Sequence, residues 1–410
     1  MFAIGSMRTI CTILLIGAVL AASGCDEHKS TPVGSDVIDR DDWGRFREIY
    51  VQPATRDSVY HQALQTGGGP LLLVGEWSGY GTKSLLRFET LPESVQVASA
   101  SVTLFTYDVI DTVTPAQTSV PEAVKVVVHL LQTGWSIDDV TFDTPLSGTP
   151  VETVAVGRAP DDSLIVSLPQ NAVQAWIDGT EENNGLLLSC LEEPTSPQGD
   201  GFIKEFYSSD SQIDAPQLRI RCALSDTSDT TFVAAPTADV FVVRRRSEWP
   251  FDTRPDRLMV GNGYVYRTLI QFAFEDSIPD EATIVRGLLT LSVDREYSFF
   301  SALEMSVYAV TSPTWDDPQF STSRFAQATV TADDDSVVFD IRGLVQSWVD
   351  EEIPNYGLLL KSTHEDWDIA FFTFHSSQGA GEWGPRLDVA YATPPDFGLK
   401  APKKERKGEP

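Results

Sequence analysis

Residues that bind transition metals are scarce in this 410-residue chain. It has four cysteines, none of them in a C-x-x-C pair, and five histidines scattered at positions 28, 61, 129, 364 and 375. Zinc and similar ions need several such ligands close together, usually with two of them a few residues apart. We therefore expect no His/Cys metal site and no resident cofactor.

Basic residues are also scarce. Lysine and arginine total 30 against 59 aspartate and glutamate residues, which gives a formal net charge of -29 at pH 7. Such an acidic surface repels phosphate backbones, so nucleic acid is not an expected partner. The hydrophobic content of 42% still allows a large core, and a chain of this length folds into roughly two to three domains.

Common catalytic and nucleotide-binding patterns are missing. The sequence has no G-x-S-x-G, no H-E-x-x-H, no P-loop and no EF-hand loop, and these are the minimal parts of several enzyme and sensor classes. We predict a non-catalytic protein. The run Asp333-Asp334-Asp335 could supply calcium ligands, but we favour a solvated turn between Val330 and Val337. A structural calcium ion held by other loop carboxylates is an open alternative with no assigned ligands.

An apolar run near the N-terminus is too short to span a bilayer. It extends from Ile10 to Ala22, about 13 residues, and leads to Ser23-Gly24-Cys25, which is the layout of a secretion signal. The residues before Cys25 resemble the bacterial lipobox, in which the cysteine thiol receives a diacylglyceryl group. We therefore predict a signal peptide over 1–24 and lipidation at Cys25. The alternative is an ordinary signal peptide cut nearby, with Cys25 as a free thiol.

The segments that flank the apolar-patterned part of the chain are polar. Residues 25–47 show no apolar period and are predicted to form a flexible tether. Residues 394–410 include a basic tail and are predicted to be disordered. A lipid on Cys25 would anchor the exported protein to a bacterial membrane, so we expect it in the cell envelope, with the choice of membrane left open.

The remainder of the chain contains an internal repeat. Lys83 to Phe88 matches Arg267 to Phe272, and each block follows a Val-Gly pair. Further blocks recur in the same order, and they centre on Trp135 and Trp315, on Trp176 and Trp348, and on Ser208-Ser209 and Ser376-Ser377. Two copies of one domain explain this order, and we place them at 48–223 and 232–393, joined by a polar linker at 224–231.

The pattern within each copy predicts an all-β fold. Ala100 to Phe105 alternates between apolar and polar residues as a half-buried strand does, whereas Leu358-Leu359-Leu360 suits a strand buried on both faces. Many short strands separated by Gly and Pro turns indicate a two-sheet sandwich. One short helix per copy is expected, with Trp176 and Trp348 packing it onto the sandwich core.

The repeated blocks resemble the DNRLRE-domain family. The resemblance rests on the Ser84-Leu85-Leu86-Arg87-Phe88 strand, the tryptophan followed by acidic residues, the Trp348 and Tyr356-Gly357-Leu358 unit, and the closing Ser-Ser with Pro-x-Leu. It implies two tandem jelly-roll-like β-sandwiches. Members of the family include carbohydrate-binding modules on alginate-degrading proteins and serve as accessory modules of secreted or surface proteins.

Aromatic residues in Gly-rich, polar segments are the candidate ligand-binding residues. Sandwiches that recognise carbohydrate use exposed rings whose flat faces stack on sugars. The candidates are Trp77 and Tyr80 in the first copy and Trp367 and Trp383 in the second. The alternative is that these rings fold back over a sandwich end as lids. In Arg244-Arg245-Arg246, alternate side chains should point to opposite faces of an edge strand.

These observations favour a non-catalytic envelope lipoprotein whose tandem sandwiches bind or scaffold extracellular material, with polysaccharide as one candidate ligand. The alternative is a structural or adhesion protein that binds another envelope protein and no sugar. Both functions would use the same exported, membrane-anchored chain. The presence or absence of a glycan ligand separates them.

Two cysteines are candidates for a disulfide. Once Cys11 leaves with the signal peptide and Cys25 is acylated, Cys190 and Cys222 are the remaining thiols, and exported compartments favour oxidation. Each lies at the end of an expected strand. We predict a bridge between them, with two separately buried thiols as the alternative.

Overall fold

The computed structural model describes residues 46–51, 54–62, 64–77, 79–111, 121–159, 163–191, 201–225, 228–245, 256–273, 277–298, 302–379 and 383–393. The predicted signal peptide, the lipidation site Cys25, most of the tether and the basic tail lie outside these residues. Within them, no helix has the length and apolarity needed to cross a membrane.

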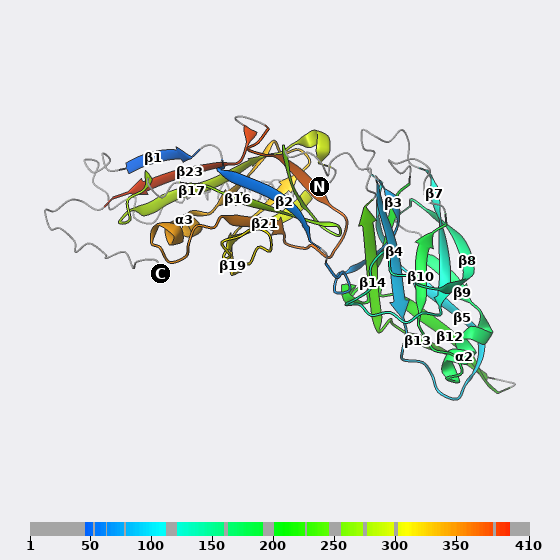
Figure 1. Cartoon of the computed structure of the whole chain (residues 1–410). Coiled ribbons are helices and arrows are strands. Elements are labelled where there is room, and N and C mark those ends of the chain that lie inside the picture. Colours follow the sequence, from blue (N-terminus) through cyan, green and yellow to red (C-terminus); the bar gives the residue numbers. More distant parts are fainter. Residues whose placement is uncertain are drawn as a thin grey trace, which may run out of the picture.

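The described chain is all-β, as predicted, with antiparallel strands in two sandwiches and two α-helices. We call the two sandwiches domain 1 and domain 2, and Figure 1 shows them joined end to side.

Domain 1 is built from two facing sheets. The larger sheet has the strand order β6 (Thr106–Ile110), β11 (Ile203–Tyr207), β3 (Leu71–Trp77), β4 (Tyr80–Arg87), β10 (Leu186–Cys190), β7 (Ala123–Leu131) and β8 (Gly148–Gly157), with β14 (Ala238–Arg245) also paired to β4. The smaller sheet has the order β13 (Ser228–Ala234), β12 (Gln217–Ser225), β5 (Gln96–Leu104) and β9 (Leu164–Leu168).

Domain 2 repeats this arrangement. Its larger sheet has the order β19 (Phe320–Thr331), β18 (Ala302–Val310), β21 (Leu358–Ser362), β16 (Val265–Gln271), β15 (Arg257–Gly261) and β22 (Phe371–His375), with β2 (Arg56–Gln62) also paired to β16. Its smaller sheet has the order β1 (Phe46–Val51), β23 (Arg386–Ala392), β17 (Thr283–Ser292) and β20 (Ser336–Asp340). Short 3-10 turns lie at Ser209–Ser211 in domain 1 and Arg295–Tyr297 in domain 2.

Matching residues of the two repeats make equivalent contacts in the two domains. The indole Nε1 of Trp135 donates to the Asn184 carbonyl at 2.9 Å, and that of Trp315 donates to the Tyr356 carbonyl at 3.0 Å. Each domain also has one helix, α2 (Gln170–Ile177) or α3 (Arg342–Val349). Trp176 and Trp348 are buried on these helices and belong to the two sandwich cores, as predicted.

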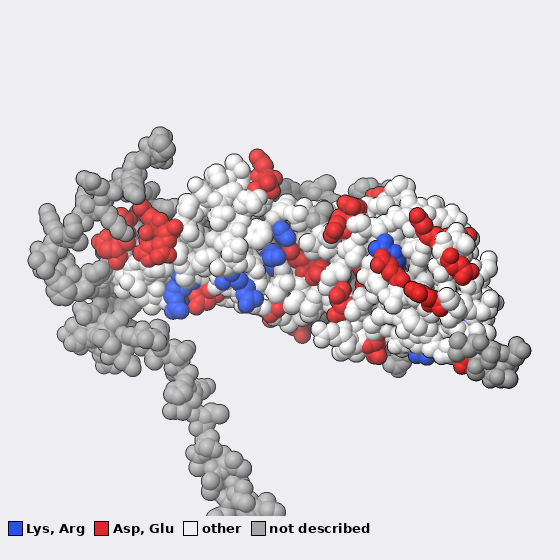
Figure 2. Space-filling model, turned by 90° about the horizontal axis from the view of Figure 1, so that it is seen from below, with Lys and Arg blue, Asp and Glu red and all other residues white. Residues whose placement is uncertain are grey.

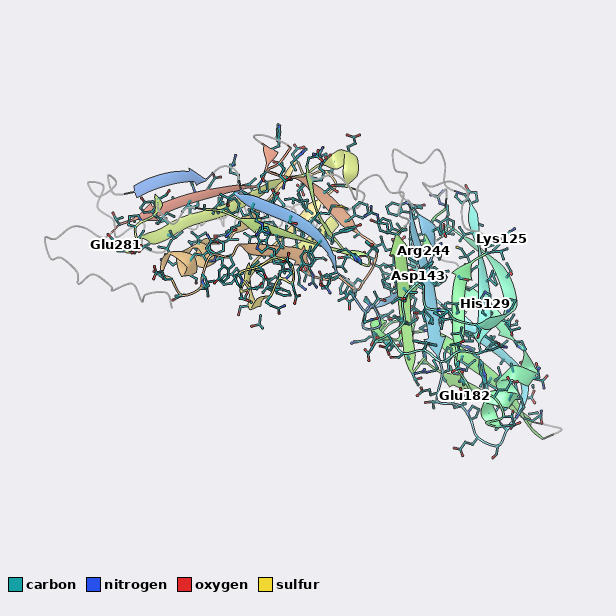
Figure 3. All side chains as sticks on the ribbon, viewed as in Figure 1. Lys125, His129, Asp143, Glu182, Arg244 and Glu281 are labelled. Carbon is teal, nitrogen blue, oxygen red and sulfur yellow. The ribbon has the colours of Figure 1, made fainter. Side chains whose placement is uncertain are left out.

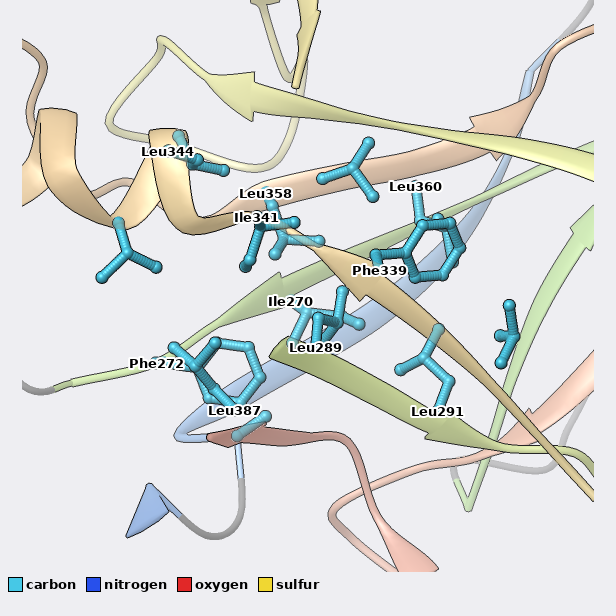
Figure 4. Close-up of a cluster of buried hydrophobic side chains, with 14 of the residues drawn as sticks. Ile270, Phe272, Leu289, Leu291, Phe339, Ile341, Leu344, Leu358, Leu360 and Leu387 are labelled. Atoms are coloured by element: carbon cyan, nitrogen blue, oxygen red, sulfur yellow. The ribbon is translucent and has the colours of Figure 1, made fainter. Parts of the chain in front are cut away.

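Each core lies between the two sheets of its domain. In domain 2 the core collects side chains from both sheets and from α3, and Figure 4 shows several of them converging, including Phe272, Leu289, Phe339, Leu344 and Leu387. Alternate residues of β20 are buried and exposed, as expected of a strand with one face on a core. The core of domain 1 is likewise formed by side chains from both of its sheets and from its helix.

The domain boundaries differ from the predicted ones because the two repeats exchange their first two strands. Strands β1 and β2 precede domain 1 in sequence, but they pair with β23 and β16 of domain 2. Strands β13 and β14 occupy the corresponding place before domain 2, but they pair with β12 and β4 of domain 1. Figure 1 shows the blue strands β1 and β2 beside the red β23 and the rest of domain 2.

Buried aspartates mark the exchange at atomic level. Asp57 on β2 accepts hydrogen bonds from Ser376 Oγ at 2.9 Å and from the Ser377 amide at 2.7 Å, across 319 and 320 residues of chain. The counterpart on β14 is Asp239, which accepts from the Ser209 amide at 2.8 Å. Thr55 and Thr237 donate their amides to Gln271 and Arg87 in the same matching way. The two strand pairs are therefore equivalent parts placed in opposite domains.

The segment 224–231, which we expected to be a linker, is instead part of a hairpin. Strands β12 and β13 pair from Leu218 opposite Ala234 to Ser225 opposite Ser228. Of the polar residues that suggested a linker, Asp229, Thr230 and Thr231 lie exposed in the edge strand β13, where polar side chains are common. Because this hairpin fixes β13 to domain 1, domain 2 has to be completed by β1 and β2. Residues 46 and 47 of the expected tether also belong to β1.

The two domains share a third apolar cluster, which we call the interface cluster. Domain 1 supplies residues from β3, β4, β6, β11 and β14, and domain 2 supplies residues from β15, β16, β22 and the segment that leads into β22. Its buried members are Leu71, Leu73, Trp77, Tyr80, Ile110, Ile203, Phe241, Met259, Tyr266, Ile369 and Phe371. The exchange and this cluster together fix the domains against each other and so position the surface described next.

Candidate functional site

Trp77 and Tyr80 are not exposed rings, so their assignment as sugar-binding candidates is wrong. Trp77 has no exposed surface and Tyr80 has 1%. Tyr80 lies 5.7 Å from Phe371 and 6.1 Å from Tyr264 between ring centroids. The Gly-rich segment around these residues is a tight hairpin between β3 and β4, and the rings pack into the interface cluster instead of facing solvent.

Trp367 is exposed, as expected, and its ring is held in a fixed orientation. Its side chain is 42% exposed and stacks on His364 with 3.7 Å between ring centroids and 21° between ring planes. His364 Nε2 in turn lies 3.4 Å from Glu304 Oε2 on β18. One face of the indole is therefore occupied by imidazole, while part of the ring stays open to solvent.

Aromatic side chains of domain 1 lie across the junction from this loop. Tyr107 on β6 is 51% exposed and contacts Tyr207 at the end of β11 edge to face, with 5.4 Å between ring centroids. Burial is the main cause that raises the pKa of the Tyr107 hydroxyl, followed by the charges of Glu205 and Asp108, and Asp368, next to Trp367, is close enough to contribute a smaller part. The backbone of Asp366, on the other side of Trp367, packs against Gly69 of domain 1.

Carboxylates from both domains meet at the same place. Burial, together with the nearby charges of Asp368 and Asp108, raises the pKa of Glu205 on β11 to about 8, so Glu205 is mostly neutral at pH 7. Burial also raises the pKa of Asp368, whose Oδ1 accepts a hydrogen bond from Asn262 Nδ2 at 2.6 Å. We call the set Tyr107, Asp108, Glu205, Tyr207, His364, Trp367 and Asp368 the junction surface.

The junction surface has the parts of a saccharide-binding surface. Trp367 and Tyr107 offer apolar ring area, and the exposed Asp108, the partly exposed Asp368 and the Tyr107 hydroxyl offer hydrogen-bond partners for sugar hydroxyls, with Glu205 buried beneath them. It has no arginine or lysine among its members. In the part of the chain that the structure describes, no group of three or more His, Cys, Asp or Glu residues is arranged to hold a metal ion.

Trp383 is exposed as well, but it lies away from the junction surface. It is 57% exposed and belongs to the connection between β22 and β23. Strand β22 starts at Phe371 in the interface cluster and ends at His375, so its far end is about 13 Å away at the usual rise per residue. The next residue, Gly384, packs against Ser377 beyond that end. The structure therefore separates the two exposed tryptophans.

The basic run does not form a basic patch. Arg244 lies over the Phe142 ring of domain 1 at 4.4 Å, whereas Arg245 lies over Tyr266 of domain 2 at 5.6 Å, so the two side chains point to opposite faces as predicted. Figure 3 shows Arg244 near Asp143, the residue after Phe142. Arg246 is outside the described residues. Figure 2 shows acidic side chains spread over both domains on the face it presents, with fewer basic ones.

The aspartate run 333–335 forms the turn that we favoured. Oδ2 of Asp334 accepts hydrogen bonds from the amide and the hydroxyl of Thr331, both at 2.7 Å, and these bonds hold the pKa of Asp334 below its usual range. Arg295 lies 3.0 Å from an oxygen of Asp335. The carboxylates thus serve the turn between β19 and β20.

The disulfide prediction is not met, because Cys190 and Cys222 are both free thiols. Cys190 ends β10 in the larger sheet of domain 1, and Cys222 lies on β12 in the smaller sheet, where it belongs to the core. Burial raises the pKa of Cys190 to about 12, which keeps its thiol protonated. The alternative of two separate thiols describes the structure, with Cys222 buried and Cys190 partly buried.

Comparisons with known proteins identify no family. No protein-family model matches the sequence, and no curated protein matches it. Among solved structures, the N-terminal CBM22-1-CBM22-2 tandem domain of Paenibacillus barcinonensis Xyn10C aligns over 84% of this chain and 92% of its own, with 7% identity and a TM-score of 0.15. A structure of infectious bursal disease virus, Gt strain, aligns over 86% and 76%, with 13% identity and a TM-score of 0.14. TM-scores this low do not indicate a shared fold.

Proposed function

We propose that this chain is a non-catalytic saccharide-binding protein and that the ligand lies on the junction surface. The observation that carries the proposal is the mounting of Trp367, which is held against His364 yet 42% exposed. A ring that is already ordered loses little conformational entropy when a sugar stacks on it. Tyr107 across the junction supplies a second exposed ring, so an extended saccharide could contact both domains.

The charges around Trp367 favour an uncharged glycan over an anionic one. Asp366 precedes the ring in sequence, and Glu304 holds its histidine. Uronate carboxylates brought next to these groups would meet like charges, which costs affinity at low and moderate salt. This distinguishes the proposed ligand from alginate, the substrate of some proteins that carry DNRLRE-type modules.

We further propose that the protein belongs to the DNRLRE family and acts in the cell envelope, anchored by a lipid on Cys25. Support for the family comes from the ordered sequence blocks and from the equivalent contacts that they make in the two domains. Support for the anchor comes from the lipobox-like residues before Cys25. Domain 2 follows the tether directly in this arrangement, because β1 is the first described strand and pairs with β23.

Replacing Trp367 by alanine is expected to weaken saccharide binding about 30-fold, the equivalent of about 2 kcal/mol, which is typical of an aromatic hot spot. The free energy of unfolding should change by less than about 1 kcal/mol, because the ring is partly exposed. Calorimetric titration with soluble neutral glucans, xylans and mannans, with alginate as the anionic probe, measures the first quantity. Chemical denaturation measures the second.

Trp383→Ala is the matched control, since it removes an equally large exposed ring outside the junction surface. It should leave the affinity within about twofold of the natural protein. Loss of binding in Trp383→Ala but not in Trp367→Ala would move the site to the loop between β22 and β23. Tightest binding to alginate would contradict the charge argument. No binding to any glycan, with specific retention of one envelope protein, would favour the adhesion alternative.

The anchor has its own test. Because the diacylglyceryl group is attached through the cysteine sulfur, Cys25→Ser should abolish metabolic labelling with a fatty acid and release the protein into the soluble fraction. Cys222→Ser is the control and should leave labelling unchanged. Fatty-acid labelling and membrane fractionation that are the same in Cys25→Ser and in the natural chain would show that the lipoprotein assignment is wrong.

A further inference from the structure

We propose that the strand pair β1–β2 can be exchanged between chains, so that domain 2 of one copy accepts β1–β2 of a second copy. The interaction surface is the pair of sheet edges that β1 and β2 cover in the monomer, the edge of β23 and the edge of β16. The partner is residues 46–62 of another identical chain. Two copies that trade these residues form a closed dimer with the same contacts as two monomers.

The contacts of β1–β2 lie in domain 2, far from them in sequence. Strand β1 pairs with β23 from Phe46 opposite Ala392 to Val51 opposite Leu387, and β2 pairs with β16 from Arg56 opposite Gln271 to Gln62 opposite Val265. Asp57 adds its bonds to Ser376 and Ser377. These contacts are defined by the acceptor domain and would be the same for a donor from either chain.

The topology lets β1–β2 leave without disturbing other strands. No described strand precedes β1, and a single connection, residues 63–70, leads from β2 to β3 in domain 1. By contrast, β13 is held by its hairpin with β12, and the chain continues from β14 into domain 2. Within the described structure, the pair β1–β2 is therefore connected to other strands at one end only, whereas the pair β13–β14 is connected at both ends.

The short connection predicts that the monomer predominates at low concentration. The connection over residues 63–70, about eight residues long, gives the chain's own β1–β2 an effective concentration in the millimolar range at its binding site on domain 2. A second chain competes only when its concentration is high or when β1–β2 has been released, as during refolding. When two chains exchange β1–β2 with each other, the dimer buries the same area as two monomers and leaves no sheet edge open. Such exchange of an identical element is how domain-swapped dimers form.

Two single-cysteine variants test the exchange in the full chain. Arg56→Cys and Gln271→Cys place thiols on opposite strands at accessible positions, and directly opposed residues are close enough for a disulfide. The variants are mixed at high concentration, taken through mild urea, returned to native buffer and oxidised. A disulfide between the two chains can form across β2 and β16 only if one chain has donated β2 to the other.

The matched control uses Arg219→Cys and Val233→Cys, which are exposed and opposed across β12 and β13. This hairpin is local, so mixed chains should give no more cross-linked product than the natural protein with its own cysteines. We expect the first mixture to give at least fivefold more cross-linked dimer than the control mixture, with a yield that rises with protein concentration. Equal yields in the two mixtures across the concentration range would overturn the proposal.

Discussion

Deleting residues 46–62 is expected to unfold domain 2 and to leave domain 1 folded, although these residues precede domain 1 in the chain. The deletion exposes the edges of β16 and β23 along their paired lengths and removes the acceptor of the hydrogen bonds from Ser376 and Ser377. A loss of this size, more than about 5 kcal/mol, equals the whole stability of a typical domain.

Hydrogen exchange followed by mass spectrometry measures this effect by region. Peptides from β16, β17 and β23 should exchange near the rate of an unfolded chain, whereas peptides from β4, β5 and β12 should remain protected. The point variants Asp57→Ala and Asp239→Ala are a matched pair, and each should destabilise the domain that holds its serine partner by about 1 to 3 kcal/mol. Loss of protection in domain 1 after the deletion would contradict the exchange.

Trp77→Ala is expected to lower the free energy of unfolding by about 3 to 5 kcal/mol, as truncations of fully buried aromatic residues do. Trp77 has no exposed surface and lies in the interface cluster, 6.5 Å from Tyr80 between ring centroids. The cavity would open between the domains, so part of the loss should appear as weaker coupling between their unfolding transitions. Chemical denaturation monitored separately by fluorescence and by far-UV circular dichroism measures both quantities.

Trp383→Ala serves as the control for this prediction too, because its ring is 57% exposed. Surface substitutions of this kind change the free energy of unfolding by about 0.5 kcal/mol or less. Equal effects of Trp77→Ala and Trp383→Ala would mean that the β3–β4 hairpin does not pack against domain 2.

The sequence predicted the fold class and the repeat because both depend on local patterns. The alternation over Ala100 to Phe105, the apolar run Leu358-Leu359-Leu360 and the helical position of Trp348 each indicate which face of one short element is buried. The equivalence of Trp135 and Trp315 was also visible as a matched position. These features survive in the structure because every strand and helix still buries the face that its own residues define.

The strand exchange could not be read from the same patterns. The blocks that revealed the repeat begin at β3 and β15, and β1–β2 has the same local pattern whichever domain it pairs with. The matching Thr55-Arg56-Asp57 and Thr237-Ala238-Asp239 segments were a usable sign of a further repeated unit. They do not show which domain each segment completes, because pairing between distant strands is set by the connections.

The candidate site was predicted in part. Trp367 lies in a polar loop and is exposed. Trp77 and Tyr80 have equally polar, Gly-rich neighbours, but they are buried in the contact between the domains. That contact cannot be seen in the sequence of either repeat. The junction residues Tyr107, Glu205 and Tyr207 were missed for the same reason. The charged pair Lys204-Glu205 inside the strand Ile203–Tyr207 was a local sign, since charged side chains in a buried strand need a special environment.

A comparison of two double-cysteine variants of the full-length chain tests most directly whether the two domains of one chain exchange their first two strands. Arg56→Cys with Gln271→Cys joins positions that are opposed in the exchanged structure, and Arg56→Cys with Arg87→Cys joins positions that would be opposed if β2 paired with β4 in place of β14. At low concentration, the exchange predicts a nearly complete intrachain disulfide in the first variant and none in the second. A disulfide in the second variant and none in the first would contradict it.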